Sequence, residues 1–411
     1  MKGAGARRRF LFVHQNFPGQ FVHLAGALAR DGHEVVALGI EGREVPGVRY
    51  FRYKPAIPKV RSSAPLMRDV EVKLIRAAAC AAAMQKLDAA GFRPDVIVAH
   101  PGWGEPLFCK DVWPAARLIV FAEFFYNAEG ADYNFDPEFS TDSAAARSSL
   151  RMKNTALLHA LHACDAAYAP TAWQHSQLPS EYRHKAAVIF DGIDTERVKP
   201  DPEASLTLPG SGITLSPADE VLTFVNRNLE PYRGFHTFMR SLPMIMKARP
   251  HAHCVIVGRD DVSYGRRPAT GGTWREVMLK EVGDQLPMDR VHFVGGLPYA
   301  EYLKVLQVST CHVYLTYPFV LGWSCVEALS AGCAVVGSDT GPVREVIEHG
   351  RTGLLVDFFD AEAVAKQVVE VMSDPGSFKS LGSAGRDQAQ VHYDLQSVCL
   401  PALRAMVEEH A

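Results

Sequence analysis

The feature that most constrains the fold is an alternation of short apolar, β-branched runs with helical patterns. It starts near residue 10 and again after residue 200. Strands that alternate with helices favour a parallel sheet with right-handed crossovers. In the first half the predicted strands are 10–13, 35–38, 95–98, 118–121 and a run around 167, with a helix near 145–163. In the second half they are 221–225, 254–257, 291–293, 312–315, 334–336 and 354–356. The chain is therefore predicted to be an α/β protein with two parallel sheets.

A segment rich in proline, glycine and serine separates the two halves between residues 190 and 217. Such a composition is typical of a linker. Single cores rarely grow beyond about 250–300 residues, so two domains are expected. We predict an N-terminal domain at 1–198, a C-terminal domain at 199–392 and a terminal helix at 393–411.

Composition argues against several classes of protein. The net charge is −3, without the strong basic excess of a nucleic-acid-binding domain, so no nucleic-acid partner is expected. No apolar run reaches the ~18–20 residues that span a bilayer, and the basic start does not have the form of a signal peptide. The eight cysteines form no C-x-x-C pair, which favours reduced core thiols in a cytoplasmic protein over disulfides or a zinc site.

The stretch 316–332 carries the clearest chemical pattern. A strand ends, a turn containing Gly322 follows, and a helix is predicted to open at Ser324. Free N–H groups at a helix N-terminus bind phosphate. Ser324 and Glu327 also have the S-x-x-E spacing of a capping box, in which Glu327 would bond a backbone N–H. Both interpretations are open from this segment alone.

A second loop, after the predicted strand 221–225, carries Arg227 and Arg233. Guanidinium groups stay charged and bind phosphate in a fork geometry, so the pair suits an anionic diphosphate. The alternative is a solvated surface loop. The diphosphate interpretation gains from placement, because this loop and the Gly322 turn are predicted at the same edge of one sheet.

In these motifs the second half resembles the retaining GT-B glycosyltransferases of family 4, also called group 1. That family has a G-R-L-x-x-x-K-G loop, an E-x7-E motif and a following glycine-rich run. The chain matches them with Arg227 to Gly234, with Gly322 to Ala328, and with 331–356, over about 130 residues. In the first half, 24–35, 95–100 and 191–194 match more loosely.

The resemblance implies a GT-B fold, in which two Rossmann-like domains face each other across a cleft and a C-terminal helix crosses back to the first domain. It implies that Arg227 and Arg233 bind the donor diphosphate, Arg233 in place of the family's lysine. Amides near Gly322 and Ser324 would hold the β-phosphate, and Glu327 would bond the ribose. In the first domain, the turn with Gly19 would face the phosphates, and His100 and Glu105 would lie near the acceptor.

Two positions depart from the family. The first glutamate of E-x7-E, which contacts the transferred sugar in the family, is Phe319 here. This puts the sugar's identity and catalysis in question. After the strand 118–121, where many relatives carry histidine, the chain has Glu123. Glu123 is either a sugar or acceptor contact or a carboxylate paired in the wall of the site, and with His100 it is a candidate catalytic residue.

We therefore expect an enzyme that moves a sugar from a UDP or GDP sugar to a glycan, lipid-linked or small-molecule acceptor. Retention follows from the resemblance. No metal or other cofactor is expected, since Asp260 and Asp261 lack the Asp-x-Asp spacing. The alternatives are a catalytically silent GT-B protein that binds a sugar nucleotide or a partner, and a sugar-nucleotide 2-epimerase. The stretch 43–76 holds nine Lys/Arg against three Asp/Glu and is either a peripheral membrane contact or solvated surface.

Overall fold

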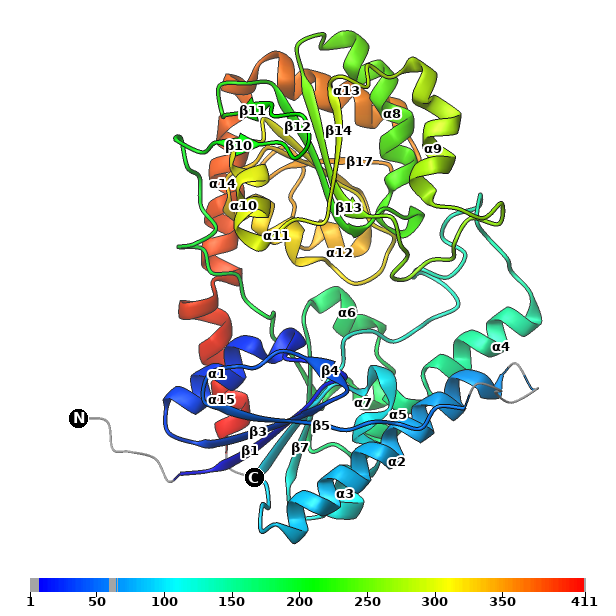
Figure 1. Ribbon diagram of the computed structural model, residues 1–411, viewed down its shortest axis with the longest axis vertical. Helices are drawn as coiled ribbons and strands as arrows, with labels where there is room; N and C mark the ends of the chain where they lie inside the picture. The colour runs from blue at the N-terminus through cyan, green and yellow to red at the C-terminus, as the bar shows by residue number, and fades with distance from the viewer. Residues whose placement is uncertain (1–6, 59–63, 65, 410–411) are drawn as a thin grey trace. The chain divides into compact units, whose positions relative to one another are not determined.

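A computed structural model describes residues 7–58, 64 and 66–409 (Figure 1). The chain divides into two compact units: unit 1 runs to Asp191 and resumes at Cys399, and unit 2 comprises Gly192–Val398. Each contains one main parallel sheet, so the predicted α/β class with two sheets is confirmed. The domain limits predicted from the sequence, 1–198, 199–392 and 393–411, remain a prediction.

Unit 1 contains a seven-stranded sheet in which all neighbouring strands are parallel. In spatial order the strands are β5 (Val48–Arg52), β3 (Glu34–Gly39), β1 (Arg9–Val13), β6 (Val96–Ala99), β7 (Arg117–Phe121), β8 (Ala166–Ala169) and β9 (Ala186–Val188). The central strands are continuous apolar runs, as expected for a parallel sheet covered on both faces. A two-stranded sheet pairs β2 (Asn16–Phe17) with β4 (Glu41–Gly42).

The helices of unit 1 follow the strands in the expected alternation. They are η1 (Gly19–Phe21), α1 (Val22–Arg30), α2 (Met67–Ala89), η2 (Pro101–Trp103), η3 (Glu105–Phe108), α3 (Cys109–Val112), α4 (Ala144–Lys153), α5 (Thr155–Ala163), α6 (Ala172–Gln177), α7 (Ser180–Arg183) and α15 (Leu400–Glu408). The single helix predicted near 145–163 is wrong, because the chain breaks at Asn154 into α4 and α5. The Asn154 side-chain amide bonds both the N–H and the carbonyl of Tyr126.

The C-terminal helix α15 packs within unit 1 beside α1 (Figure 1). Arg117 donates to the carbonyl of Met406 at 2.7 Å, and Arg404 pairs with Asp31. The predicted return of the C-terminal helix to the first domain is therefore confirmed. Among the described residues, no helix has both the length and the apolar character needed to cross a bilayer.

Unit 2 contains a six-stranded parallel sheet and a small hairpin of β10 (Leu206–Thr207) and β11 (Thr214–Leu215). In spatial order the strands are β14 (Val291–Gly295), β13 (His253–Arg259), β12 (Val221–Asn228), β15 (Cys311–Tyr314), β16 (Val335–Ser338) and β17 (Leu354–Val356). The helices are η4 (Pro231–Arg233), α8 (Phe235–Ala248), α9 (Trp274–Val282), η5 (Gly283–Gln285), α10 (Tyr299–Gln307), α11 (Trp323–Ser330), α12 (Gly341–Arg344), α13 (Ala361–Ser373), α14 (Pro375–Tyr393) and a π turn at Leu395–Cys399.

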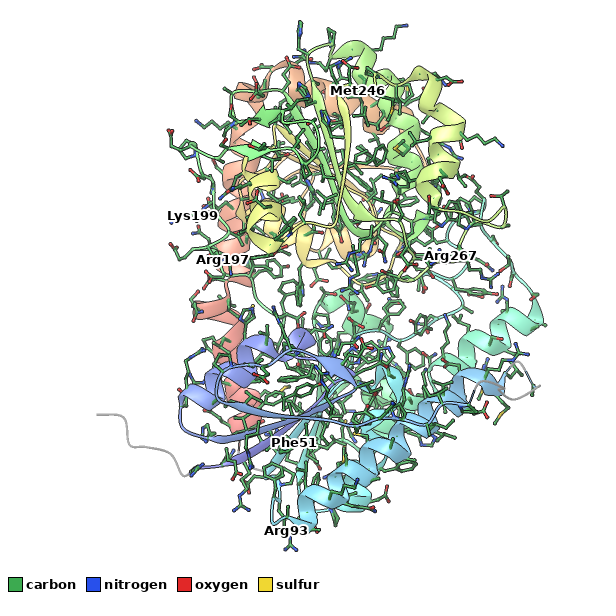
Figure 2. The ribbon with its side chains drawn as sticks, in the orientation of Figure 1. Phe51, Arg93, Arg197, Lys199, Met246 and Arg267 are labelled. Carbon is green, nitrogen blue, oxygen red and sulfur yellow. The ribbon has the colours of Figure 1, made fainter. Side chains whose placement is uncertain are left out.

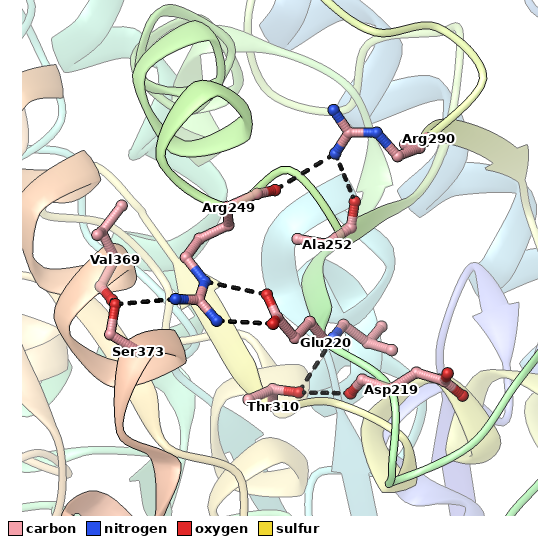
Figure 3. A network of polar contacts seen from close by, with 9 residues as sticks. Asp219, Glu220, Arg249, Ala252, Arg290, Thr310, Val369 and Ser373 are labelled. Atoms are coloured by element: carbon pink, nitrogen blue, oxygen red, sulfur yellow. Dashed lines mark hydrogen bonds and ion pairs between the residues drawn. The ribbon is translucent and has the colours of Figure 1, made fainter.

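The amino ends of the central strands in unit 2 are held by a polar network (Figure 3). The Arg249 guanidinium bonds both oxygens of Glu220, at 3.0 and 2.6 Å, just before β12. Arg290 donates to the carbonyls of Arg249 and Ala252, and Thr310 bonds the carbonyl of Asp219 at 3.0 Å. Forked guanidinium–carboxylate pairs fix geometry well. The polar side chains at this amino edge are therefore used in hydrogen bonds that stabilise the fold. The candidate site lies in the loops at the opposite, carboxyl edge of the sheet.

Candidate functional site

In unit 1, polar side chains gather where three adjacent strands end. His14 follows β1, His100 follows β6, and Glu123 comes two residues after β7. These strands are parallel neighbours, so their carboxyl ends lie side by side. Ligands of open α/β sheets bind at this edge. The structure thus brings the predicted residues His100 and Glu123 together, with His14 as a member that the sequence pattern did not reveal.

A directed chain of hydrogen bonds links His14 to Glu123. The backbone N–H of Asn16 donates to His14 Nδ1 at 3.0 Å, so the neutral ring carries its proton on Nε2. His14 Nε2 donates to Gln20 Oε1 at 3.0 Å, and Gln20 Nε2 donates to Glu123 Oε1 at 3.1 Å. Burial, reinforced by the neighbouring His100, lowers the pKa of His14 to about 3. His14 is thus neutral near pH 7 and orients the Gln20 amide toward Glu123.

His100 approaches the other oxygen of Glu123. Its Nδ1 accepts the N–H of Gly102 at 3.0 Å, and its Nε2 lies 3.4 Å from Glu123 Oε2 without a hydrogen bond between them. The His100 ring is buried against Trp103, with 4.5 Å between ring centroids, whereas the Glu123 side chain is 30% exposed. Glu123 is therefore accessible to a bound molecule, whereas the rings of His14 and His100 are buried.

Gly19 has a steric role beneath this group. Its φ is +49°, and a Cβ at this position would lie 2.4 Å from His14 Nε2. A side chain would therefore displace the ring that orients Gln20. Its predicted contact with the donor phosphates remains a prediction. Glu105, expected near the acceptor, is 1% exposed and accepts the Tyr53 hydroxyl at 2.8 Å; burial raises its pKa.

In unit 2 the two predicted arginines occupy different environments. Arg227 is exposed near the end of β12. Arg233 is 7% exposed, and its Nη1 donates to Thr316 Oγ1 at 2.8 Å and to the carbonyl of Val320 at 2.9 Å. Arg233 therefore anchors the 316–322 loop as well as bringing charge to it, while Arg227 presents its charge to solvent.

Hydroxyl groups fix the start of the same loop. Ser338 Oγ accepts the backbone N–H of Thr316 at 3.0 Å and donates to its carbonyl at 3.1 Å. Thr340 Oγ1 donates to the Thr316 carbonyl at 3.2 Å. The ends of β15 and β16 are thus joined by buried, hydrogen-bonded hydroxyls, a rigid support for a site at this edge.

Glu230 is a residue that the sequence reasoning missed. It is 1% exposed, and its carboxylate accepts the backbone N–H groups of Ser263, at 3.0 Å, Tyr264 and Gly265, at 2.8 Å. The Tyr264 ring lies over the Arg233 guanidinium, 5.2 Å from its centroid. The sequence did show a carboxylate between the two arginines, and it lies two residues after the end of β12. Its partners lie 33 to 35 residues away, beyond the reach of local patterns.

The helix after Gly322 begins one residue earlier than predicted. Gly322 is the N-cap residue of α11, and no side chain caps the helix, so the capping-box interpretation of Ser324 and Glu327 is wrong. The N–H of Gly322 donates to the Tyr314 hydroxyl at 2.8 Å. Ser324, half-buried, lies in the first turn of α11, where N–H groups point out of the helix end.

Glu327 is buried and bonded to two tyrosines of α10. Its Oε1 accepts the Tyr299 hydroxyl and its Oε2 accepts the Tyr302 hydroxyl, both at 2.7 Å. Burial raises the pKa of Glu327, while bonds from Tyr302 and Tyr299 and the charge of Arg197 lower it and favour the ionised form. A buried carboxylate held in this way is typical of a functional site.

Phe319, at the position of the family's first glutamate, is 3% exposed in an aromatic cluster. Its ring lies 4.8 Å from Tyr264 and 5.6 Å from Tyr232, and the Arg233 guanidinium is 6.0 Å from its centroid. A ring at this position accepts no sugar hydroxyl as a carboxylate would. The 316–322 loop therefore has an apolar, packed ring at the position where the family has a hydrogen-bond-accepting carboxylate.

Two family models match the chain. The model described as "Glycosyl transferase family 4 group" matches residues 31–198, and the one described as "Glycosyl transferases group 1" matches residues 212–388. A GDP-mannose-dependent phosphatidylinositol monomannoside mannosyltransferase of Mycobacterium tuberculosis is 29% identical over 226 residues, 53% of this chain and 55% of the relative. Glycogen synthase of the same species is 27% identical over 211 residues, 51% of this chain and 45% of the relative. The matches thus span about half the length of these curated relatives.

Solved structures resemble the whole chain at low identity. Sucrose-phosphate synthase from Thermosynechococcus elongatus superposes with a TM-score of 0.73 at 18% identity, covering 98% of this chain and 99% of the other. HepE of Anabaena, solved in complex with UDP, gives a TM-score of 0.64 at 15% identity, covering 98 and 100%. At these identities the likeness concerns the fold.

Proposed function

Because the chain belongs to the group 1 glycosyltransferases of family 4, with a GT-B fold of two Rossmann-like units, we propose that it transfers a sugar from a nucleoside diphosphate sugar to a hydroxyl acceptor. The observation that carries the proposal is the carboxyl edge of unit 2. There Arg227, the start of α11 and the buried Glu327 supply groups for a diphosphate and a ribose. A GDP-mannose-dependent relative and a neighbour solved with UDP support a donor of the GDP or UDP type.

In this proposal unit 2 stabilises the leaving diphosphate. Negative charge develops on the phosphate as the glycosidic bond breaks, and prearranged cations and N–H dipoles lower the energy of that state. Arg227 contributes an exposed charge, Arg233 holds the loop, and amides near Gly322 and Ser324 face the β-phosphate. Transfer then needs no divalent metal. In support, Asp260 is paired with Arg275 at 2.6 Å and Asp261 with Arg267 at 2.7 Å.

In the proposed reaction, unit 1 binds the acceptor substrate. The exposed part of Glu123 accepts a hydrogen bond from a substrate hydroxyl, Gln20 holds its carboxylate in place, and His100 lies beside it. Gly19 leaves room for the His14 ring, and its contact with the donor phosphates is part of this proposal. Retention of anomeric configuration is the outcome expected of the family. A glycan, a lipid-linked sugar and a small metabolite are the acceptor classes to test.

We also propose that an apolar patch at the start of α2 gives peripheral contact with an anionic membrane. The patch consists of Leu66, Met67 and Leu74, which are 40, 46 and 44% exposed, and Arg68 is exposed beside it. Anionic lipids attract basic segments that carry apolar side chains. Of the basic stretch 43–76, residues 59–63 and 65 lie outside the described residues.

The experiment that tests the function is a transfer assay with EDTA present. UDP-, GDP- and ADP-sugars are incubated with the protein and each acceptor class, and products are analysed by mass and by anomeric configuration. We expect one donor to give a glycosylated product with retention. Nucleotide binding without any product would instead favour the silent GT-B alternative, and an isomerised sugar released without acceptor would favour the epimerase.

A further inference from the structure

The carboxylate of Glu327 is held by two phenol groups that share one face of α10. Tyr299 and Tyr302 are three residues apart, so their side chains lie on the same side of the helix. Each hydroxyl donates to a different oxygen of Glu327, at 2.7 Å in both cases. The contact joins α10 to α11 and fixes the plane of the carboxylate.

This arrangement leaves a defined acceptor capacity. An ionised carboxylate has about four lone-pair positions, two on each oxygen. The tyrosines use one position on each, so one remains on Oε1 and one on Oε2. Two adjacent hydroxyls of a ribose are spaced to donate one hydrogen bond to each oxygen. The geometry therefore fits a vicinal diol better than a single hydroxyl.

The two tyrosines differ in accessibility. Tyr302 is 9% exposed and Glu327 is 6% exposed, whereas Tyr299 is 41% exposed. The Arg197 guanidinium lies 4.7 Å from the centroid of the Tyr299 ring, and Arg197 belongs to the chain segment that enters unit 2 (Figure 2). The backbone N–H of Arg197 bonds Asp194 Oδ1 at 3.1 Å, which fixes this segment. Tyr299 is therefore the more accessible of the two tyrosines bonded to Glu327.

We propose that Tyr299 is a positioning residue of a ribose subsite: through its bond to Glu327 it presents the carboxylate to the 2′- and 3′-hydroxyls of a nucleotide, and Arg197 holds its ring in place. This inference rests on the proposed use of a nucleotide donor. It goes further in assigning ribose recognition to a three-residue unit, Tyr299, Tyr302 and Glu327. It also makes the site selective for ribonucleotides.

The test combines ligand and protein changes. Dissociation constants of UDP, GDP and their 2′-deoxy forms are measured by calorimetry for the wild type and for Tyr299→Phe. We expect the wild type to prefer the ribonucleotide by roughly 10-fold or more, the scale of one hydrogen bond to a charged group. Tyr299→Phe should reduce this preference at least 3-fold, mainly by weakening the ribonucleotide. The matched control is Tyr133→Phe, which removes a phenol–carboxylate bond of 3.0 Å in unit 1 and should keep the wild-type preference.

A second variant, Arg197→Gln, tests the same inference even if Tyr299→Phe fails to fold. Arg197 is exposed, so Arg197→Gln should fold, free the Tyr299 ring and lower the preference by about 2- to 3-fold. An unchanged preference in both variants, or an equal loss for ribo- and deoxyribonucleotides, would overturn the inference while leaving the proposed function intact. Failure of UDP and GDP to bind the wild type would overturn both.

Discussion

Single residues hold the two candidate carboxylates by different means. Glu123 in unit 1 is held by the amide of Gln20 and faces the ring of His100. Glu327 in unit 2 is held by two phenols and is more deeply buried. The amide and the imidazole leave the Glu123 carboxylate partly in water, which suits exchange with an acceptor hydroxyl. The phenols of Tyr299 and Tyr302 hold the buried Glu327 carboxylate in one orientation, which suits a ligand contact of fixed geometry.

The group around Glu123 depends on the absence of a side chain at Gly19. We predict that Gly19→Ala displaces His14, breaks its bond to Gln20 and lowers the transfer rate at least 10-fold. We expect it to cost about 2–3 kcal/mol of stability, from the clash and the positive φ. The control is Gly32→Ala, where φ is +88° and nothing lies within 4 Å of a Cβ. Measured by denaturant unfolding and transfer assays, Gly32→Ala should cost only about 1 kcal/mol and keep the rate; equal effects would contradict the steric account.

Arg233 has a structural role that its exposed neighbour Arg227 lacks. We predict that Arg233→Ala destabilises the protein by about 2–4 kcal/mol, because Thr316 and the carbonyl of Val320 lose a buried donor. Arg240→Ala, which breaks a surface ion pair with Glu281, should cost no more than about 1 kcal/mol. Chemical denaturation of the two variants checks this. Similar losses would mean that Arg233 does not anchor the loop.

Among the elements, the six strands of the unit 2 sheet and the five inner strands of the unit 1 sheet were predictable from the sequence, because a buried parallel strand is a short apolar run. The edge strands β5 and β9 of unit 1 were not predicted, since they are largely exposed and lack that pattern. The placement of His100, Glu123 and the Gly322 turn at carboxyl edges followed from strand order. The break at Asn154 and the partners of Glu327 did not. They depend on contacts between residues 28 apart along the chain, the Asn154 side chain with the Tyr126 backbone and the Glu327 side chain with that of Tyr299, and local periodicity does not encode such contacts.

The same limit applies to the loops of unit 2. The sequence shows Arg227 and Arg233 as two charges near one turn, but it does not show that Arg227 is exposed and Arg233 is buried. Arg233 is enclosed by Tyr264, which Glu230 holds through backbone N–H groups of a distant loop. Sequence spacing indicates which loops share an edge, whereas burial depends on how those loops fold over one another.

The start of α2 supports a prediction about membranes. Replacing Leu66, Met67 and Leu74 by serine should reduce cosedimentation with vesicles of anionic phospholipid by at least 5-fold, since apolar burial and charge act together. The control is Val391→Ser in α14, 63% exposed and distant in sequence, which should leave cosedimentation unchanged. Binding of the wild type that is equal for neutral and anionic vesicles would contradict the proposed contact. Phe51, also exposed, lies on β5, the strand that precedes α2 in the chain (Figure 2).

The protein as a whole carries buried neutral histidines in both units. Burial lowers the pKa of His312 in unit 2 to about 3, as for His14 in unit 1. The unfolded chain has histidine pKa values near ~6.5, so between about pH 6.5 and 3 it binds more protons than the folded chain. Their contribution to stability is thus complete above pH 6.5 and is lost as the pH falls. Glu105 and Glu327, whose pKa values are raised by burial, act in the opposite direction.

The loss of stability at low pH that the buried histidines cause can be measured in a histidine variant. We predict that the drop in Tm between pH 7.5 and pH 5 is smaller for His312→Gln than for the wild type, because one buried group no longer gains a proton on unfolding. His184→Gln, at an exposed histidine, should show the wild-type drop. Thermal unfolding at the two pH values decides the matter, and an unchanged drop in His312→Gln would refute the assignment.

At the scale of the whole molecule, the carboxyl edge of unit 2 is proposed to bind the diphosphate of a sugar nucleotide without a metal. The most direct test of this binding is calorimetric titration of the full chain with UDP, GDP, ADP and NAD in the presence of EDTA, repeated with Arg227→Ala. We expect UDP or GDP to bind with a Kd on the order of micromolar, and Arg227→Ala to weaken this binding about 10-fold or more without changing Tm. Absence of binding by every diphosphate, or binding that is indifferent to Arg227, would contradict the proposal.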